Sequence, residues 1–252
     1  KEDNGKYILT EIADFINRTI ETKGIDKSDV IGVGLGVPGP VNKNGFVSVC
    51  VNLGWNSLNV EKEFHEISGL PVQVGNDANV AALGEMWQGA GKGYQDVLMV
   101  TLGTGVGGGC VLNGKIVSGI HGAGGEIGHM PVKDDEPTAC NCGNHGCLEQ
   151  YVSATGIVTQ AKKVLDQDAR SSSLRNYECL EAKHVYDEAK NGDVVANEIV
   201  DSTCKILAKA LAQICSVIDP EIIVIGGGVS KAGDILISRI TQSFKKYVFN
   251  AC

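Results

Sequence analysis

Three cysteines lie within eight residues in the segment Cys140-Asn-Cys142-Gly-Asn-His-Gly-Cys147. A histidine, His129, stands eleven residues before the first of them. Three thiolates and one imidazole are a ligand set that zinc binds in tetrahedral structural sites. The two glycines of the segment can adopt the tight or positive-φ turns that a short loop needs to wrap around one ion. We therefore predict a zinc-binding loop over 129–147, with His129, Cys140, Cys142 and Cys147 as the ligands.

A redox pair or a disulfide is the alternative for these cysteines. A disulfide would leave one of the three thiols unpaired. The chain has nine cysteines, and several of the others, such as Cys110, Cys204 and Cys215, stand singly in apolar surroundings. Reduced core cysteines of this kind are typical of a cytosolic protein. The sequence therefore favours a metal site over a disulfide and predicts a cytoplasmic protein.

The composition is that of a globular protein with a sizeable core. The chain has 252 residues, of which 43% are hydrophobic and 21% are charged. Such a chain can bury one large core or two ordinary ones. We predict a smaller N-terminal lobe over 1–92 and a larger C-terminal lobe over 93–252, with a glycine-containing hinge over 89–93.

The charge balance limits the partners of this segment. Lys and Arg total 22, while Asp and Glu total 30, for a net charge of −8. A surface of this sign offers no electrostatic footprint for nucleic-acid phosphates. No apolar run approaches the roughly eighteen residues that span a bilayer. We expect no nucleic-acid binding within this segment and no membrane partner.

Apolar periodicity predicts an α/β arrangement of the chain. In the first lobe, we expect helices over 8–20 and 60–67, strands over 30–37 and 72–74, and a helix opened by residues 75–79. In the second lobe, we expect strands over 97–101, 107–112, 115–118 and 222–225, and helices over 155–165, 194–217 and 233–246. Asn113-Gly114 between two apolar runs predicts a tight hairpin.

Several ordered motifs make the chain resemble a known family. They are Gly36-Val-Pro38-Gly39-Pro40, Asn52-Leu-Gly-Trp55, Asn76-Asp77-Ala-Asn79, Thr101-Leu-Gly103-Thr104-Gly105-Val-Gly107, Gly125-Glu126-Ile-Gly-His129, the cysteine segment 140–147 followed by Glu149, and Gly226-Gly227-Gly228-Val-Ser230. With these motifs the chain resembles the bacterial ROK family of sugar kinases, and most closely its glucokinase branch, over nearly its whole length.

The resemblance implies an α/β fold of the actin-like ATPase type, with two duplicated ribonuclease-H-like lobes and a cleft where ATP and sugar meet. It also implies a homodimer. Members of the family begin with three strands that carry an Asp-x-Gly-Gly-Thr phosphate loop, and they end with a further helix. Neither segment lies within 1–252. We therefore interpret the chain as a fragment that lacks the N-terminal ATP phosphate loop and the C-terminal helix.

Asp77 is the candidate for the chemical step. It follows a short strand and opens a helix, and from spacing alone a helix N-cap explains an aspartate there equally well. The resemblance implies instead that Asp77 is the general base for the attacking hydroxyl. Phosphoryl transfer needs such a base, an in-line hydroxyl and positive charge around the phosphates.

The resemblance assigns the sugar to a set of hydrogen-bonding side chains. Carboxylates accept hydrogen bonds from the hydroxyl groups of a pyranose, and amides both donate and accept such bonds. His129 would bind zinc with one ring nitrogen and a sugar hydroxyl with the other. Glu126 and Glu149 could instead be solvated surface carboxylates, and Asn52 could belong to a turn beside a packing tryptophan. The implied sugar-binding set is Asn52, Asn76, Asp77, Glu126, His129 and Glu149.

Two glycine-rich turns are the candidates for nucleotide binding. Glycine lets backbone amides approach anionic oxygens, although glycines after a strand are also ordinary turn residues. The resemblance implies that the ATP phosphates lie at the first turn and adenosine at the second, with Mg²⁺ required by the reaction. The turns are Gly103-Thr104-Gly105 and Gly226-Gly227-Gly228.

Two functions of different class follow from the sequence. The first is an ATP-dependent hexose kinase, in particular a glucokinase, which binds ATP, Mg²⁺ and a structural Zn²⁺ and phosphorylates the C6 hydroxyl of glucose. Kinases for mannose, fructose or an N-acetylhexosamine are variants of it. The second is a sugar-sensing transcriptional regulator, because the resembled family includes repressors with a helix-turn-helix before the sugar lobe. Asp77 and the intact Thr104-Gly105 turn favour the enzyme.

Overall fold

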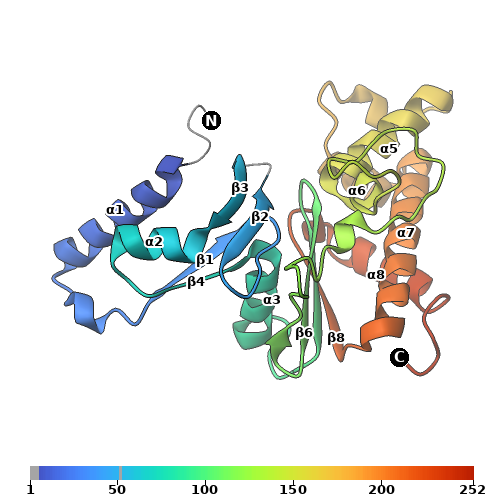
Figure 1. Cartoon of the computed structure of the whole chain (residues 1–252). Helices are drawn as coiled ribbons and strands as arrows, with labels where there is room; N and C mark the ends of the chain where they lie inside the picture. Colours follow the sequence, from blue (N-terminus) through green and yellow to red (C-terminus); the bar gives the residue numbers. More distant parts are fainter. Residues whose placement is uncertain (1–5, 51–52) are drawn as a thin grey trace.

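Helices and strands form two α/β groups, with one helix, α3, between them (Figure 1). The computed structural model describes residues 6–50 and 53–252. The first group consists of α1 (Lys6–Lys23), a 3₁₀ turn (Lys27–Asp29), β1 (Val33–Val37), β2 (Phe46–Cys50), β3 (Trp55–Asn59), α2 (Val60–Ser68) and β4 (Val72–Asn76).

The second group is larger and begins with α3. Its elements are α3 (Asp77–Gln88), β5 (Val97–Leu102), β6 (Val106–Leu112), β7 (Lys115–Ile116), a 3₁₀ turn (Ile127–His129), α4 (Glu149–Val152), α5 (Ala154–Gln167), a 3₁₀ turn (Ser173–Asn176), α6 (Ala182–Lys190), α7 (Val194–Ile218), β8 (Ile222–Gly226), a 3₁₀ turn (Val229–Ala232) and α8 (Asp234–Phe244).

The first group places the start of α3 at the end of a parallel strand pair. β1 and β4 run parallel, and their last partners are Val37 and Asn76. β2 and β3 form a separate antiparallel pair. α1, α2 and these strands share a core that includes the fully buried Val47, Val60 and Phe64. Because β4 passes directly into α3, Asp77 lies beside the loop that follows β1.

The second group is built on one sheet with helices on both faces. Its strand order is β7-β6-β5-β8, and β5 runs parallel to β8 but antiparallel to β6. The side chains of β5 alternate between the faces, as a period of two requires. Leu98 and Val100 join the large core under α4 to α8, whereas Val97 and Met99 pack with Ala82 of α3. The 25-residue α7 contributes many of the buried residues of the large core.

Glycines in β6 let α3 lie close to the sheet. A Cβ atom built on Gly109 would stand 2.6 Å from Cβ of Ala82, and one on Gly107 would stand 3.1 Å from Cβ of Ala78. Larger side chains there would push the helix away from the strand. The glycine-rich sequence of β6 therefore sets the position of α3 and of Asp77 at its beginning.

Most of the elements expected from the sequence are present, with shifted ends. The strand expected over 30–37 begins at Val33, and the strand expected over 115–118 ends at Ile116. The hairpin at Asn113-Gly114 is confirmed, with φ of 51° and 71° at its two residues. The antiparallel pair β2–β3 and the helix α6 were not expected. The boundary between lobes at residue 92 stays a prediction.

All nine cysteines lie within the described residues, and all nine are free thiols, so a disulfide in the cysteine segment is not formed. Among the described residues, no helix combines the length and the apolar character that crossing a membrane requires.

Candidate functional site

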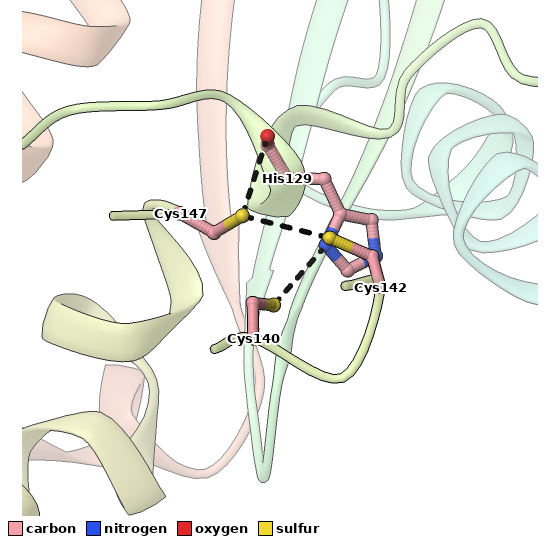
Figure 2. Close-up of side chains that lie close together, drawn as sticks. All are labelled: His129, Cys140, Cys142 and Cys147. Atoms are coloured by element: carbon pink, nitrogen blue, oxygen red, sulfur yellow. Dashed lines mark hydrogen bonds between the residues drawn. The ribbon is translucent and has the colours of Figure 1, made fainter. Parts of the chain in front are cut away.

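The four predicted metal ligands come together in the structure (Figure 2). The ligand atoms of His129, Cys140, Cys142 and Cys147 all lie within 4.8 Å of one another. Sγ of Cys142 is 3.6 Å from Sγ of Cys147, and Sγ of Cys140 is 3.7 Å from Nδ1 of His129. A tetrahedral zinc ion with Zn–S bonds of about 2.3 Å places its sulfur ligands about 3.8 Å apart. The donor set and its spacing therefore fit zinc, with no position left for substrate.

The cysteine segment is folded as a narrow hairpin by its own backbone. Isolated β-bridges join Pro131 to Cys147 and Ala139 to His145. The amide of Cys140 donates to the carbonyl of Asn144 at 2.7 Å. Gly146 has a φ of 70°, and a Cβ there would collide with the carbonyl oxygen of Lys133. Glycine is therefore required at this turn, as the sequence suggested.

Two glutamates lie beside the histidine of the cluster. Oε1 of Glu149 is 3.8 Å from Nδ1 of His129 and accepts from the thiol of Cys140 at 3.0 Å. Glu126 precedes the short turn that carries His129 and is partly buried. Burial raises the pKa of Glu126, the charge on His129 lowers it, and the charges on Asp77 and Glu149 raise it further. The two glutamates are therefore not isolated surface carboxylates.

Asn76 caps the beginning of α3, and Asp77 next to it is exposed. Asn76 is the N-cap: its side chain accepts from the amide of Asn79 at 3.1 Å and donates to the carbonyl of Gly39 at 3.1 Å. The alternative that Asp77 is the N-cap is therefore wrong. Asp77 is the first helical residue, and its exposed carboxylate accepts from the amide of Ala78 at 2.8 Å. Its negative charge is favourable at a helix N-terminus.

The loop of Glu126 and the start of α3 are in direct contact. Oδ1 of Asn79 is buried, and it stands 3.5 Å from the place that a Cβ on Gly125 would occupy. A Cβ on Gly125 would also stand 2.6 Å from the carbonyl oxygen of Gly108 in β6. Glycine at this position lets the loop pack against both elements. This contact accounts for the electrostatic effect of Asp77 on Glu126.

The two glycine-rich turns lie side by side at one edge of the sheet. The first joins β5 to β6 and the second follows β8, and the last paired residues of β5 and β8 are Thr101 and Gly226. Gly227 has a φ of 87°, and a Cβ there would meet the backbone of Leu102 at 2.5 Å. Ligands bind at such carboxyl edges of parallel strands in many α/β proteins.

Glu149 connects the histidine cluster to the first glycine turn. A Cβ built on Gly105 would stand 2.7 Å from Oε2 of Glu149. The amide of Ala154, in the same segment, donates to the carbonyl of Gly103 at 2.8 Å. One carboxylate therefore has an oxygen at the cluster and an oxygen at the turn predicted for phosphate.

Asn52 lies outside the described residues. Trp55 in the same motif is buried, as expected for a packing tryptophan. Glu136 is a buried residue of the hairpin over 131–147, named here the metal hairpin, and sequence reasoning missed it because the run Asp134-Asp135-Glu136 looks like a solvated acidic segment. Nothing in this run of three acidic residues indicates that Glu136 is buried.

A separate groove of about 630 Å³ lies along α3, away from the predicted site. Its lining includes Leu83, Trp87 and Tyr94, and none of the described candidate residues lines it.

Comparisons with known proteins agree on one family. Residues 2–252 match the ROK family. A protein named glucokinase from Halalkalibacterium halodurans is 45% identical over 251 residues, which cover 98% of this chain and 76% of that protein. A solved ROK family glucokinase from Streptomyces griseus, in complex with glucose and AMPPNP, matches with a TM-score of 0.78 and 33% identity over 95% of this chain and 78% of that one.

A solved regulator matches the fold as well. It is a ROK family transcriptional regulator, a homologue of the E. coli MLC protein, with a TM-score of 0.85 and 27% identity. The match covers 98% of this chain but 62% of the regulator.

The arrangement of helices, sheet and glycine turns, with the family match, defines an α/β protein with the actin-like ATPase fold, as expected, and with a cysteine–histidine set that fits zinc. Within that class, the chain belongs to the ROK family.

Proposed function

We propose that this protein is an ATP-dependent hexose kinase, a glucokinase, that transfers the γ-phosphate of ATP to the C6 hydroxyl of glucose. The observation that carries the proposal is the position of Glu149. Its Oε1 lies 3.8 Å from Nδ1 of His129, the histidine whose other ring nitrogen is proposed for the sugar, while its Oε2 lies against Gly105 at the predicted phosphate turn. A sugar and a terminal phosphate bound at these places would be adjacent. The relatives named glucokinase support the same activity.

Asp77 is the proposed general base. Its carboxylate is exposed, and Asn76 fixes the start of its helix by capping it and by bonding to the loop after β1. Proton transfer from a hydroxyl to a positioned carboxylate contributes roughly 10²- to 10⁴-fold to such reactions. Asp77 would accept the proton of the C6 hydroxyl as that oxygen attacks the γ-phosphorus, in line with the leaving group.

The sugar hydroxyls would bind to the side chains around Asp77. The carboxylates of Glu126 and Glu149 would accept hydrogen bonds from sugar hydroxyls, and the ring nitrogen of His129 that does not face the thiols would contact a further hydroxyl. Burial of Glu126, which raises its pKa, also strengthens hydrogen bonds to it because the local dielectric constant is low. Asn76 has one amide N–H beyond its bond to Gly39, and Asn52 completes the proposed set.

The nucleotide would enter as its magnesium complex, which is a substrate of the reaction. We assign its phosphates to the amides of Gly103-Thr104-Gly105 and its adenosine to Gly226-Gly227-Gly228. The open space beside Gly103 and Gly228, where a Cβ would meet no atom within 4 Å, supports this assignment. His129, Cys140, Cys142 and Cys147 would hold a zinc ion, which would supply a structural anchor for the hairpin and fix the ring of His129.

The decisive experiment measures ATP-dependent formation of glucose 6-phosphate by the protein and its Asp77→Asn variant. We expect kcat to fall about 10³-fold in the variant, with glucose binding retained. Asp14→Asn, which changes an exposed aspartate on α1 in the same way, is the control and should match the wild type. Equal turnover by Asp77→Asn and wild type would remove Asp77 from the mechanism.

A sugar-sensing regulator is the second candidate, favoured by the TM-score of 0.85 with the solved regulator. Glucose binding without turnover by the full-length wild-type protein would select this alternative. A panel of glucose, mannose, fructose and N-acetylhexosamines in the same assay tests the identity of the sugar.

Two further properties belong to the proposal. A homodimer is expected from the resemblance, and light scattering of the purified protein tests it. A cytoplasmic location agrees with the nine free thiols, because disulfides are rare in that compartment.

A further inference from the structure

Glu136 is a buried carboxylate in an otherwise exposed part of the metal hairpin. Its side chain is 5% exposed, while its sequence neighbours Asp135 and Pro137 are exposed. Among the described residues, it is the only Asp, Glu, Lys or Arg that is buried. Burial of an ionised carboxylate is costly unless it is paired and hydrogen-bonded. Buried Glu136 therefore requires partners that offset this cost.

The partners of Glu136 come from two helices outside the hairpin. The hydroxyl of Tyr151 in α4 donates to Oε2 at 2.7 Å, and Nζ of Lys163 in α5 lies 3.1 Å from both carboxylate oxygens. The amide of Thr138 donates to Oε1 at 3.2 Å. These donors, with Tyr151 first, hold the pKa of Glu136 down to about 2. The carboxylate is thus ionised at neutral pH and ties the hairpin to α4 and α5.

Three consecutive residues at the start of α4 hold three different parts of the site. Tyr151 holds Glu136, as described. Gln150 accepts from the amide of Cys147 at 3.0 Å and donates to the carbonyl of Thr138 at 2.9 Å. Glu149 faces the histidine cluster and Gly105. Because α4 has four residues, a rotation at Tyr151 also turns Glu149.

We infer that Glu136 is a positioning residue, which fixes α4 through Tyr151 and Lys163 so that Glu149 is aimed at the sugar. The inference rests on the sugar site of the proposed function. It adds an anchor that does not involve the metal ligands, because the contacts of Glu136 are made by oxygen and nitrogen atoms outside the cysteine–histidine set. The hairpin is therefore held both by its metal ligands and by Glu136, which lies in its first strand between the bridged residues Pro131 and Ala139.

The test compares Glu136→Ala and Glu136→Gln with the wild-type protein. Glucose affinity is measured by calorimetry, and the rate of zinc release from zinc-loaded protein is measured with a chromogenic chelator. We expect Glu136→Ala to weaken glucose binding at least tenfold and to speed zinc release at least tenfold. Glu136→Gln should fall between, because its amide oxygen still accepts from Tyr151 but does not pair with the charge of Lys163.

A matched control uses a second glutamate paired with a cation. Glu198 in α7 accepts two hydrogen bonds from Arg170, at 2.8 and 2.6 Å, and lies outside the metal hairpin. Glu198→Gln should leave both measurements within twofold of wild type. A loss of glucose affinity in this control as large as in Glu136→Gln would overturn the inference.

A positioning role also predicts different effects on KM and on kcat. We expect Glu136→Gln to raise KM for glucose while kcat at saturating glucose stays within threefold, since Asp77 is unchanged. Lys163→Met should raise KM for glucose in the same way, whereas Lys163→Arg should keep KM near the wild-type value. If Glu136→Ala does not fold, these two variants test the inference in its place. Wild-type glucose affinity in Lys163→Met and Glu136→Gln together would refute the inference. Calorimetry and zinc release need no turnover, so failure of the kinase proposal is seen separately.

Discussion

Gly105→Ala tests the contact between the predicted phosphate turn and the predicted sugar site. The φ of Gly105 is outside the left-handed region, so alanine is compatible with the backbone there. The added Cβ would stand 2.7 Å from Oε2 of Glu149, whereas ordinary contact begins near 3.4 Å. The carboxylate would therefore have to retreat by about 0.7 Å, the difference of these two distances.

The size of the effect follows from what Glu149 is proposed to do. Hydrogen bonds to charged groups contribute about 1.5–3 kcal/mol, and a shift below 1 Å weakens such a bond without abolishing it. We therefore expect a loss of about 1–2 kcal/mol in glucose binding, which is roughly a 5- to 30-fold weaker affinity at 1.4 kcal/mol per factor of ten.

Calorimetric titration with glucose is the assay, and Gly103→Ala is the matched control. A Cβ on Gly103 meets nothing within 4 Å, although the residue lies in the same turn. Gly103→Ala should bind glucose within twofold of the wild type, and any effect it has should fall on KM for ATP. The reasoning is refuted if Gly105→Ala binds glucose as tightly as wild type, or if both variants weaken glucose equally.

Three further predictions concern the metal, the pH dependence and the fold. Cys147→Ser should reduce bound zinc at least tenfold by metal analysis, whereas Cys179→Ser, at an exposed cysteine outside the cluster, should retain it. The folded pKa of Glu136 is about 2 against an ordinary 4.5, so its contribution of on the order of 3 kcal/mol is present above pH 4.5 and is lost as the pH falls towards 2. In zinc-free protein, the difference in unfolding free energy between wild type and Glu136→Gln should therefore shrink over that range, and a constant difference would contradict this. Gly227→Ala should lower the unfolding free energy by about 2 kcal/mol, because its φ is positive and its Cβ would strike the backbone of Leu102, while Gly228→Ala should be nearly neutral in urea titrations.

Features defined by short spacing could be predicted from the sequence. The three cysteines and His129 are brought together largely by one hairpin, so their spacing already limits how they can meet. The Asn113-Gly114 turn was predictable because both residues accept positive φ, which this hairpin uses. Family motifs then indicated which separate segments share a site, a step that periodicity alone does not give.

Features that depend on tertiary packing could not be predicted in this way. β3 has the sequence Trp-Asn-Ser-Leu-Asn, which is too polar to predict a strand. Its backbone is also irregular, because Ser57 has a φ of 52°. Asn76 rather than Asp77 caps α3, because the side chain of Asn76 also bonds to Gly39 on a neighbouring segment. The burial of Glu136 depends on Lys163, which is 27 residues away in sequence.

The short length of α4 explains why so many contacts gather around Glu149. Isolated helices below about twelve residues are marginal in water, and α4 has four residues, so its own hydrogen bonds cannot fix its direction. Its orientation must come from its surroundings. Tyr151 is held by Glu136 on one side, and the amide of Ala154 just beyond α4 is bound by Gly103 on the other. A carboxylate that contacts both the histidine cluster and the glycine turn is therefore placed by neighbouring segments, and changes in any of them should be felt first as a change in sugar affinity.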